Sequence, residues 1–271
     1  MTGQPAATTK PRRGPVPLKN FLARVIRSER ITPHMYRVTI GDGDLANFVS
    51  AAADQFITLI LPQPGQERPL IDPATFNWEF FRTMPDDIRP IARNYTARRH
   101  RPEVAEIDVD FVLHGDGGPA SQWALAAKPG DHLAIWGPRM AYAPPEGTDW
   151  QLLCADETGL PAVAAILEEL APGERAVAFV EIADAGEAQP LVSAGDVAVN
   201  WLHRNGIAVG ESDLLIDAVR EATFPTGTVY AWGGGERRLM AAVRKHLQDE
   251  RGVPTGAISF INYWRMGNHE D

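Results

Sequence analysis

Residues 93–98, with the sequence Arg-Asn-Tyr-Thr-Ala-Arg, combine side chains that suit a nucleotide cofactor. Side chains alternate along a strand, so Arg93 and Tyr95 share one face, and Thr96 and Arg98 share the other. An arginine fork donates two parallel hydrogen bonds to a diphosphate. A tyrosine ring can lie flat on an isoalloxazine ring, and a threonine hydroxyl can bond a flavin nitrogen. An ordinary barrel strand with exposed arginines is the alternative interpretation.

A glycine-rich segment, residues 114–118, lies one strand further along and leads into a helix that begins near Pro119. Glycines let the backbone approach a phosphate, and a helix N-terminus presents free N–H groups and a partial positive charge. Ser121 can add a hydroxyl. A glycine-rich turn before a helix is common in any protein, but two adjoining strands would bring this segment and residues 93–98 to one ligand.

The elements that position these segments are mainly strands in the first half of the chain. Strand-like runs lie at residues 21–27, 34–40, 55–61, 92–100, 104–113 and 132–136. Short strands separated by turn residues, with almost no helix, predict a small antiparallel β-barrel.

The second half alternates between strands and helices. We expect strands at residues 150–155, 175–182, 197–202, 227–232 and 257–263, and helices at residues 160–170, 213–222 and 236–250. This alternation predicts an α/β domain with a parallel sheet. The predicted organisation is a disordered lead-in at 1–20, an antiparallel barrel at 21–140 and an α/β domain at 149–271.

Composition excludes several classes of protein. The net charge of -9 and the pI of about 5.3 argue against non-specific binding to nucleic acid or to an anionic membrane surface. The single cysteine, Cys154, rules out an intramolecular disulfide and a cysteine-ligated iron–sulfur cluster, and its apolar neighbours predict a buried strand residue. The histidines show no metal-ligand spacing. No run approaches a membrane span, and the N-terminus lacks a signal-peptide core, so we expect a cytoplasmic protein.

Taken together, R-x-Y-T-x-R followed by D-x-x-x-V-L-H-G-x-G-G-P-A resembles the siderophore-interacting proteins. These are FAD-dependent ferric-siderophore reductases of the ferredoxin–NADP reductase-like superfamily. Three later segments are similar to the same family: Asp156-Glu157-Thr158-Gly159-Leu160-Pro161-Ala162, Trp232-Gly233-Gly234-Gly235-Glu236 and Tyr263-Trp264-Arg265-Met266-Gly267. The resemblance covers most of the chain and implies a ferredoxin reductase-like fold, with an FAD-binding barrel before an NAD(P)H-binding domain.

The resemblance also assigns residues to roles. It implies FAD contacts from Arg93, Tyr95, Thr96 and Arg98, a pyrophosphate-side group of His114, Gly118, Ala120 and Ser121, inter-domain contacts at the nicotinamide site from Asp156, Glu157 and Thr158, and a flavin-shielding aromatic residue, Trp264. No residue is expected to transfer protons at the iron.

The chain departs from the family pattern at the expected siderophore patch. Thr58 stands where many members have a lysine, and Met266 stands where many have a second arginine. Arg139 and Arg265 remain as the candidates that bind an anionic ferric siderophore. Gly159, in place of the usual alanine, is interpreted as one small residue replacing another.

The implied reaction moves electrons from NAD(P)H through FAD to a ferric siderophore, and releases ferrous iron because that ion binds hard oxygen ligands more weakly. One alternative is a general NAD(P)H–flavin reductase or electron-transfer protein with another acceptor, which Thr58 and Met266 favour slightly. Others are a siderophore-binding protein without turnover, and electron supply from a ferredoxin. The resemblance suggests a monomer. The sequence leaves the siderophore and the choice between NADH and NADPH open.

Overall fold

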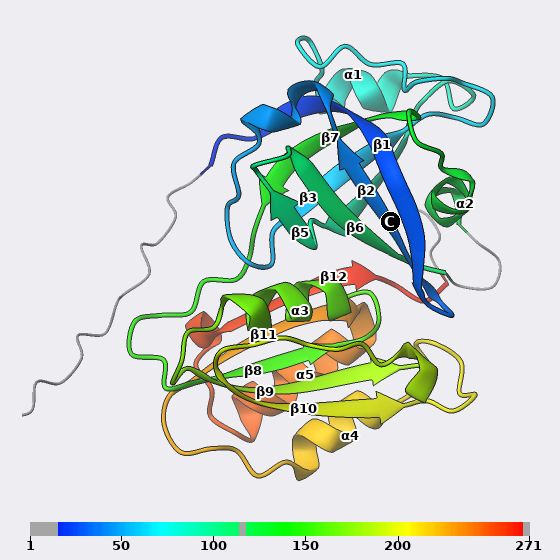
Figure 1. Ribbon diagram of the computed structural model, residues 1–271. Helices are drawn as coiled ribbons and strands as arrows, with labels where there is room; N and C mark the ends of the chain where they lie inside the picture. Colours follow the sequence, from blue (N-terminus) through cyan, green and yellow to red (C-terminus); the bar gives the residue numbers. More distant parts are fainter. Residues whose placement is uncertain (1–15, 114–117, 268–271) are drawn as a thin grey trace, which may run out of the picture.

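The computed structural model describes residues 16–113 and 118–267, which form an antiparallel sheet followed by a parallel one (Figure 1). The first sheet has seven strands in the order β4-β3-β7-β1-β2-β6-β5. These strands are β1 (Lys19–Thr32), β2 (Met35–Gly41), β3 (Phe56–Leu61), β4 (Ile91–Thr96), β5 (Arg99–Arg101), β6 (Glu106–Val112) and β7 (His132–Arg139). The edge strands, β4 and β5, are separated in the chain only by Ala97 and Arg98, so the sheet curls until its edges meet. The predicted barrel is confirmed.

The barrel interior follows from the alternation along β6. Ile107, Val109 and Phe111 point into the core and are fully buried. The aspartates between them are also buried, because arginines pair with them: Arg101 with Asp108 at 2.6 Å, and Arg37 with Asp110 at 2.6 Å. Burial alone raises the pKa of Asp108, but hydrogen bonds from Arg101 and Thr39 outweigh this effect and hold that pKa below its ordinary value.

The second sheet is parallel, with five strands in the order β10-β9-β8-β11-β12. They are β8 (Trp150–Ala155), β9 (Arg175–Ile182), β10 (Asp196–His203), β11 (Val229–Glu236) and β12 (Ile258–Trp264). Helix α3 (Leu160–Glu169) packs between this sheet and the barrel, while α4 (Leu214–Glu221) and α5 (Arg237–Asp249) cover the other face (Figure 1). The predicted parallel-sheet architecture is confirmed. The strand order reverses between β8 and β11, where open α/β sheets bind ligands.

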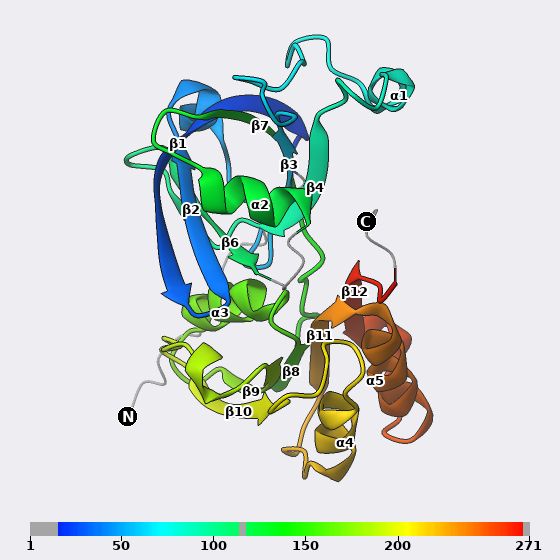
Figure 2. The ribbon, with the colours of Figure 1, turned by 90° about the vertical axis from the view of Figure 1, so that its right-hand side faces the viewer.

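The remaining short elements lie in the connections. They are α1 (Trp78–Thr83), α2 (Pro119–Ala126) and the 3-10 turns η1 (Gly43–Asn47), η2 (Ala185–Glu187) and η3 (Thr255–Ala257). Helix α1 was not expected, and it lies on the same side of the molecule as the end of β12 (Figure 2). Its Phe81 and the adjacent Met84 pack against the barrel strands through Ile60 and Ala134. Among the described residues, no helix is both long and apolar enough to cross a membrane.

Two predicted boundaries are wrong. The expected strand at 92–100 is interrupted, because Ala97 and Arg98 carry the chain from one barrel edge to the other. The glycines at 233–235, expected in the connection between a strand and a helix, belong to β11. All three pair with β12, and Gly233 and Gly234 also pair with β8. A side chain at Gly235 would lie 2.7 Å from the carboxylate of Asp156, so glycine permits this close packing. Cys154 is buried as predicted, and burial raises its pKa.

Gly159 is required by packing, which corrects the interpretation of a simple exchange between small residues. It caps α3 at the point where the loop after β8 touches β11. A Cβ atom at Gly159 would lie 2.2 Å from the carbonyl oxygen of Gly234 and 2.9 Å from the Cβ of Ala155. Alanine therefore requires this loop to move away from β11.

We expect Gly159→Ala to lower the free energy of unfolding by about 1–3 kcal/mol, because the added methyl group overpacks a buried contact. Urea denaturation followed by circular dichroism measures the change. Gly256→Ala is the matched control, since a Cβ there meets nothing within 4 Å. Equal denaturation midpoints for the two variants would show that the loop moves at no cost.

Candidate functional site

The end of β4 in the barrel meets the end of β12 in the parallel sheet. Thr96, the last residue of β4, is buried, and its hydroxyl lies near that of Tyr263. Burial raises the pKa of Tyr263, and the nearby Thr96 hydroxyl lowers it by a smaller amount. Apart from this approach to each other, neither hydroxyl has a hydrogen-bond partner within the described part of the chain. Buried hydroxyls with so few partners are costly, so this pair is suited to a polar ligand that enters between the two sheets.

Arg93 and Tyr95 lie on the same strand. One face of the Tyr95 ring packs on Phe111, with ring centroids 4.3 Å apart, and burial raises the pKa of its hydroxyl. Arg93 is half-buried and donates from Nη1 to the carbonyl oxygen of Ala92 at 2.8 Å. Arg93 and Tyr95 therefore lie on one face of β4 and Thr96 on the other, at the end of the strand that meets β12.

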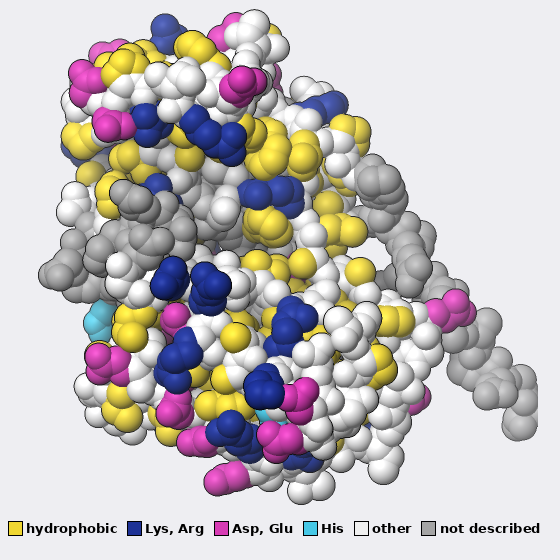
Figure 3. All heavy atoms as spheres, turned by 180° about the vertical axis from the view of Figure 1, so that it is seen from behind, with side chains coloured by type: hydrophobic (Ala, Val, Ile, Leu, Met, Phe, Trp, Pro, Cys, Tyr) yellow, Lys and Arg dark blue, Asp and Glu magenta, His cyan; other side chains and the backbone are white. Residues whose placement is uncertain are grey.

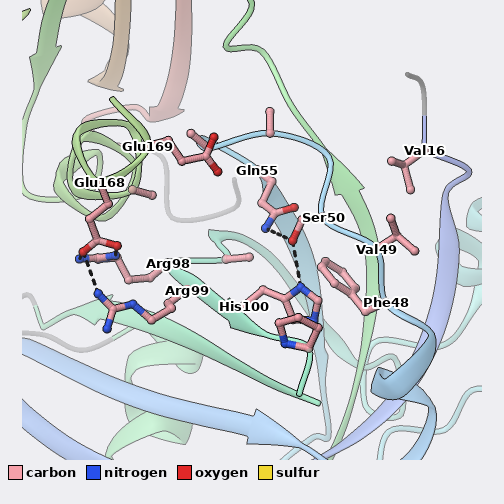
Figure 4. Close-up of a pocket in the computed structure, with 15 residues that line it drawn as sticks. Val16, Phe48, Val49, Ser50, Gln55, Arg98, Arg99, His100, Glu168 and Glu169 are labelled. Carbon is pink, nitrogen blue, oxygen red and sulfur yellow. Dashed lines mark hydrogen bonds and ion pairs between the residues drawn. The ribbon is translucent and has the colours of Figure 1, made fainter. Parts of the chain in front are cut away.

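Arg98 forms an ion pair with helix α3. Its guanidinium makes a bidentate ion pair with Glu168 of α3, at 2.6 and 3.1 Å, and Arg99 joins the same carboxylate at 2.8 Å. Figure 4 shows this pair in a groove of about 720 Å³ between the barrel and α3, beside the linked side chains of Ser50 and His100. Both terminal nitrogens of Arg98 bind Glu168, so the structure gives no support to the predicted FAD contact.

Helix α2 presents its N-terminus beside the barrel strands. Gly118 is the N-cap, Pro119 occupies the first helical position, and a helical hydrogen bond runs from Gln122 N–H to the Gly118 carbonyl. The preceding N–H groups, at Ala120 and Ser121, have no partner inside the helix and can bind an anion. The Ser121 hydroxyl donates to the carbonyl oxygen of Val112 at 3.2 Å, so it orients the helix. His114 lies outside the described residues.

Asp156 joins three strand ends at the point where the strand order reverses. Its buried carboxylate accepts hydrogen bonds from the backbone N–H of Thr158, the backbone N–H of Glu236 and the indole N–H of Trp264, each at 2.8 Å. These contacts tie together β8, β11 and β12 within the parallel sheet. Asp156 was predicted to make an inter-domain contact, but these hydrogen bonds lie within the parallel-sheet domain. One of them holds Trp264 in place.

Glu157 also differs from its predicted role. It is 4% exposed and forms a bidentate pair with Arg204, at 2.5 and 2.8 Å, directly after β10. Glu181 of β9 lies 3.5 Å from the same guanidinium and is also buried. Burial raises the pKa of Glu181, although the charge of Arg204 opposes this shift. Because both oxygens of the Glu157 carboxylate bind Arg204, Glu157 is not available to the barrel or to a nucleotide.

Arg139 ends β7 beside the same part of β4. Its guanidinium lies over the rings of Phe56 and Trp136, at 4.4 and 4.8 Å from their centroids. Nη2 donates to Thr58 Oγ1 at 2.7 Å and to Asn94 Oδ1 at 2.6 Å. Burial lowers the pKa of Arg139, and its Nε is buried with no partner among the described groups. Thr58 thus supports Arg139 where a lysine was expected. Arg265 is exposed after β12.

Charge on the molecular surface follows the same junction. Seen from behind, Lys and Arg side chains lie on both sides of the boundary between the barrel and the parallel-sheet domain (Figure 3). This local distribution differs from the net charge of -9. An anionic ligand is therefore compatible with the junction in spite of the acidic composition.

Sequence reasoning missed the buried acids that join the two sheets. Asp54 accepts from the indole N–H of Trp232 at 3.0 Å and from the backbone N–H of Tyr142 at 2.8 Å, and burial raises its pKa. Glu187 accepts from the backbone N–H of His34 at 3.0 Å and also bonds Thr32. These partners are far apart in the chain and share no motif, so no local sequence signal identifies them.

The residues present fit a flavin nucleotide. The hydroxyls of Thr96 and Tyr263, which have no described partner beyond each other, offer hydrogen bonds to a polar ring edge, and the N-terminus of α2 offers N–H groups to a diphosphate. Tyr95 adds an aromatic ring held in position by Phe111. These groups come from strands β4 and β12 and helix α2, which the fold brings to one region.

Comparison with known proteins agrees with this site. Residues 24–142 match the siderophore-interacting FAD-binding domain, and residues 148–267 match the siderophore-interacting protein domain. An NADPH-dependent ferric-chelate reductase of Escherichia coli (strain K12) is 30% identical over 89% of this chain and 91% of its own length. A protein of Mycobacterium tuberculosis (strain ATCC 25618 / H37Rv) is 35% identical over 94% of this chain and 93% of its own.

Solved structures agree as well. A siderophore utilization protein from T. fusca superposes with a TM-score of 0.83 and 38% identity, covering 94% of this chain and 96% of that one. The ferredoxin reductase in carbazole 1,9a-dioxygenase, with a TM-score of 0.65 and 17% identity, covers 92% of this chain and 70% of that one and shows the fold alone. The predicted ferredoxin reductase-like fold is thus confirmed, and the chain belongs to the siderophore-interacting protein family.

Proposed function

We propose that this chain is an FAD-dependent reductase that passes electrons from NAD(P)H to a ferric siderophore. In this proposal residues 21–140 hold FAD and residues 149–271 bind NAD(P)H. The observation that carries it is the pair of buried hydroxyls, Thr96 and Tyr263, which lie at the junction of the two sheets and have no described partner beyond each other. The named activity of the Escherichia coli relative supports the same reaction. When bound, FAD supplies the redox chemistry, since it accepts two electrons together and can release them singly to ferric iron.

The protein contributes position and hydrogen bonds. The Thr96 hydroxyl is proposed to bond the flavin ring, and Tyr95 is proposed to pack against that ring. Arg93 and the N-terminal N–H groups of α2 are proposed to bind the diphosphate. Trp264, held by Asp156 at 2.8 Å, is proposed to cover the flavin on the nicotinamide side. Thr158, whose N–H is fixed by Asp156, completes the loop proposed to lie beside the nicotinamide cofactor.

Arg139 is proposed to bind the ferric complex, together with Arg265. The rings of Phe56 and Trp136 fix the Arg139 guanidinium, and Thr58 and Asn94 bind only its Nη2. Among the described residues, no carboxylate forms an ion pair with Arg139. Its positive charge is therefore left to attract an anionic chelate. We further expect the protein to act as a monomer in the cytoplasm.

A general NAD(P)H–flavin reductase with another acceptor is the second candidate. Thr58 favours it, because the site has a hydroxyl where many relatives have a lysine. Electron supply from a ferredoxin would replace the nicotinamide step and leave the flavin and iron steps unchanged. The two half-reactions can be measured separately, so each candidate has its own signature.

The first test is the absorbance spectrum of the purified protein under anaerobic conditions. We expect a flavin spectrum that bleaches when NADH or NADPH is added and recovers when a ferric siderophore follows. Bleaching without recovery would identify another acceptor, and a flavin that only reduced ferredoxin bleaches would replace the nicotinamide step. Absence of flavin after incubation with FAD would contradict the proposal.

Thr96→Val tests the hydroxyl that carries the proposal. Removing this buried hydroxyl, which has no described partner other than Tyr263, is expected to leave the stability of the FAD-free protein nearly unchanged, measured by urea denaturation. The same change is expected to weaken FAD binding about tenfold, measured by flavin fluorescence, because one hydrogen bond to the ring is lost. Thr75→Val, an exposed threonine that bonds Asp72, is the control. Unchanged FAD affinity in Thr96→Val would remove Thr96 from the site.

Arg139→Gln tests the iron-chelate site. We expect the KM for an anionic ferric chelate to rise about tenfold, because a charged hydrogen-bond donor is lost while glutamine can still bond Thr58. Steady-state ferrous iron formation measures KM and kcat separately. Arg24→Gln, an exposed arginine on β1 that lies 3.7 Å from Asp42, is the control for lost surface charge. Equal KM values in both variants would exclude Arg139 as a substrate contact.

A further inference from the structure

Asn94 lies on the face of β4 that points away from the barrel core. Its neighbour Tyr95 packs against that core, and side chains alternate along a strand, so Asn94 and Thr96 share the outer face. The register between β3 and β4 pairs Thr58 with Asn94 and Phe56 with Thr96. Two residues along a strand span about 7 Å, so Asn94 lies next to the Thr96 hydroxyl that is proposed to bond the flavin ring.

The hydrogen bonds around Asn94 fix the orientation of its side-chain amide. Oδ1 of Asn94 accepts from Nη2 of Arg139 at 2.6 Å and from the Thr58 hydroxyl at 2.8 Å. A guanidinium can only donate, so the amide atom that faces Arg139 must be the oxygen. The Thr58 hydroxyl itself accepts from Arg139 at 2.7 Å, which leaves its own proton for Asn94. Both acceptor positions of Oδ1 are therefore used, and Nδ2 is directed away from the guanidinium.

The amide nitrogen of Asn94 is open to a ligand. Asn94 is exposed, and within the part of the chain that the structure describes its Nδ2 donates to no other group. The N–H groups of Nδ2 can therefore donate to an oxygen acceptor. The Arg139 guanidinium, fixed over the rings of Phe56 and Trp136, supplies a positive charge to the same place. A neutral donor beside a cation suits an anionic ligand that presents several oxygen atoms.

We infer that Asn94 is a substrate contact, whose Nδ2 donates a hydrogen bond to an oxygen ligand of the ferric chelate while Arg139 binds the negative charge of that chelate. The inference rests on the proposed function and deepens its iron-chelate site. Oxygen atoms that coordinate ferric iron keep lone pairs, so they can accept this bond. A chelate held in this way lies over the outer face of β4 beside Thr96, which places the iron next to the proposed position of the flavin ring.

Asn94→Asp tests this contact, because aspartate keeps an oxygen for Arg139 and Thr58 and removes the N–H groups. The probes are ferric EDTA, which is an anion, and ferric tris-acetohydroxamate, which is neutral. On the flavin-loaded protein we expect the KM for the neutral chelate to rise about fivefold, because one hydrogen bond is lost. The KM for the anion is expected to rise at least about tenfold, because the new carboxylate also repels it. The kcat values and the bleaching of the flavin by NADH or NADPH are expected to stay unchanged.

Gallium complexes of the same two ligands supply a readout without electron transfer, because gallium in these complexes accepts no electron from a flavin. Calorimetric titration measures their Kd values, which are expected to rise in Asn94→Asp by the same factors as KM. Asn47→Asp is the matched control, because Asn47 is an exposed asparagine of the barrel domain at the end of η1. Its KM and Kd values are expected to equal those of the unmodified protein.

A weaker interaction with the anion alone would overturn the inference, because Asn94 would then act only through the charge of Arg139. Unchanged Kd values in Asn94→Asp, or failure of the unmodified protein to bind either gallium complex, would overturn it as well. A reduced flavin that neither iron chelate reoxidises would instead contradict the proposed function, and the gallium titrations would still decide the role of Asn94.

Discussion

The carboxylate of Asp156 is the interaction on which the geometry of the site depends. It lies where the strand order of the parallel sheet reverses, and it satisfies donors from the loop after β8, from the end of β11 and from Trp264. A buried carboxylate is stable there because three N–H groups replace its water. The close approach of β11 that this requires explains the glycines: Gly235 borders the carboxylate, and Gly159 borders Gly234.

Acidic side chains, buried or half-buried, also join the two halves of the molecule. Asp54 accepts hydrogen bonds from Trp232 and from the segment that connects the two sheets. Glu187 accepts hydrogen bonds from Thr32 and His34, and Glu168 accepts them from Arg98 and Arg99. Each acid accepts bonds from elements distant in the chain. The relative position of barrel and parallel sheet thus depends on directional polar contacts as well as on apolar packing. These contacts hold the barrel and the parallel sheet together, so that groups from β4 and β12 can form one binding region.

Much of the fold follows from the sequence, because period-two alternation and strand–helix alternation are local signals. The barrel, the parallel sheet and the start of α2 at Pro119 agree with the structure. Thr96 and Trp264 belong to recognisable segments, and their place in a flavin site stays a prediction.

The partners of charged residues could not be predicted. Arg98 and Glu157 belong to motifs, yet their ion pairs with Glu168 and Arg204 depend on contacts that only the tertiary fold creates. The glycines of β11 were misassigned for a related reason: glycine usually signals a turn, but here the absence of a side chain leaves space for Asp156. Short helix α1 lacks a long apolar period, and its Phe81 is held by tertiary packing.

The two residues that separate β4 from β5 carry an additional consequence. Ala97 and Arg98 connect the edges that close the barrel, follow directly on Thr96, and lead into the ion pair with α3. Barrel closure, the Thr96 hydroxyl and the inter-domain contact are therefore encoded in three adjacent positions. The effects of substitutions in this segment are expected to be non-additive, because neighbouring residues share contacts.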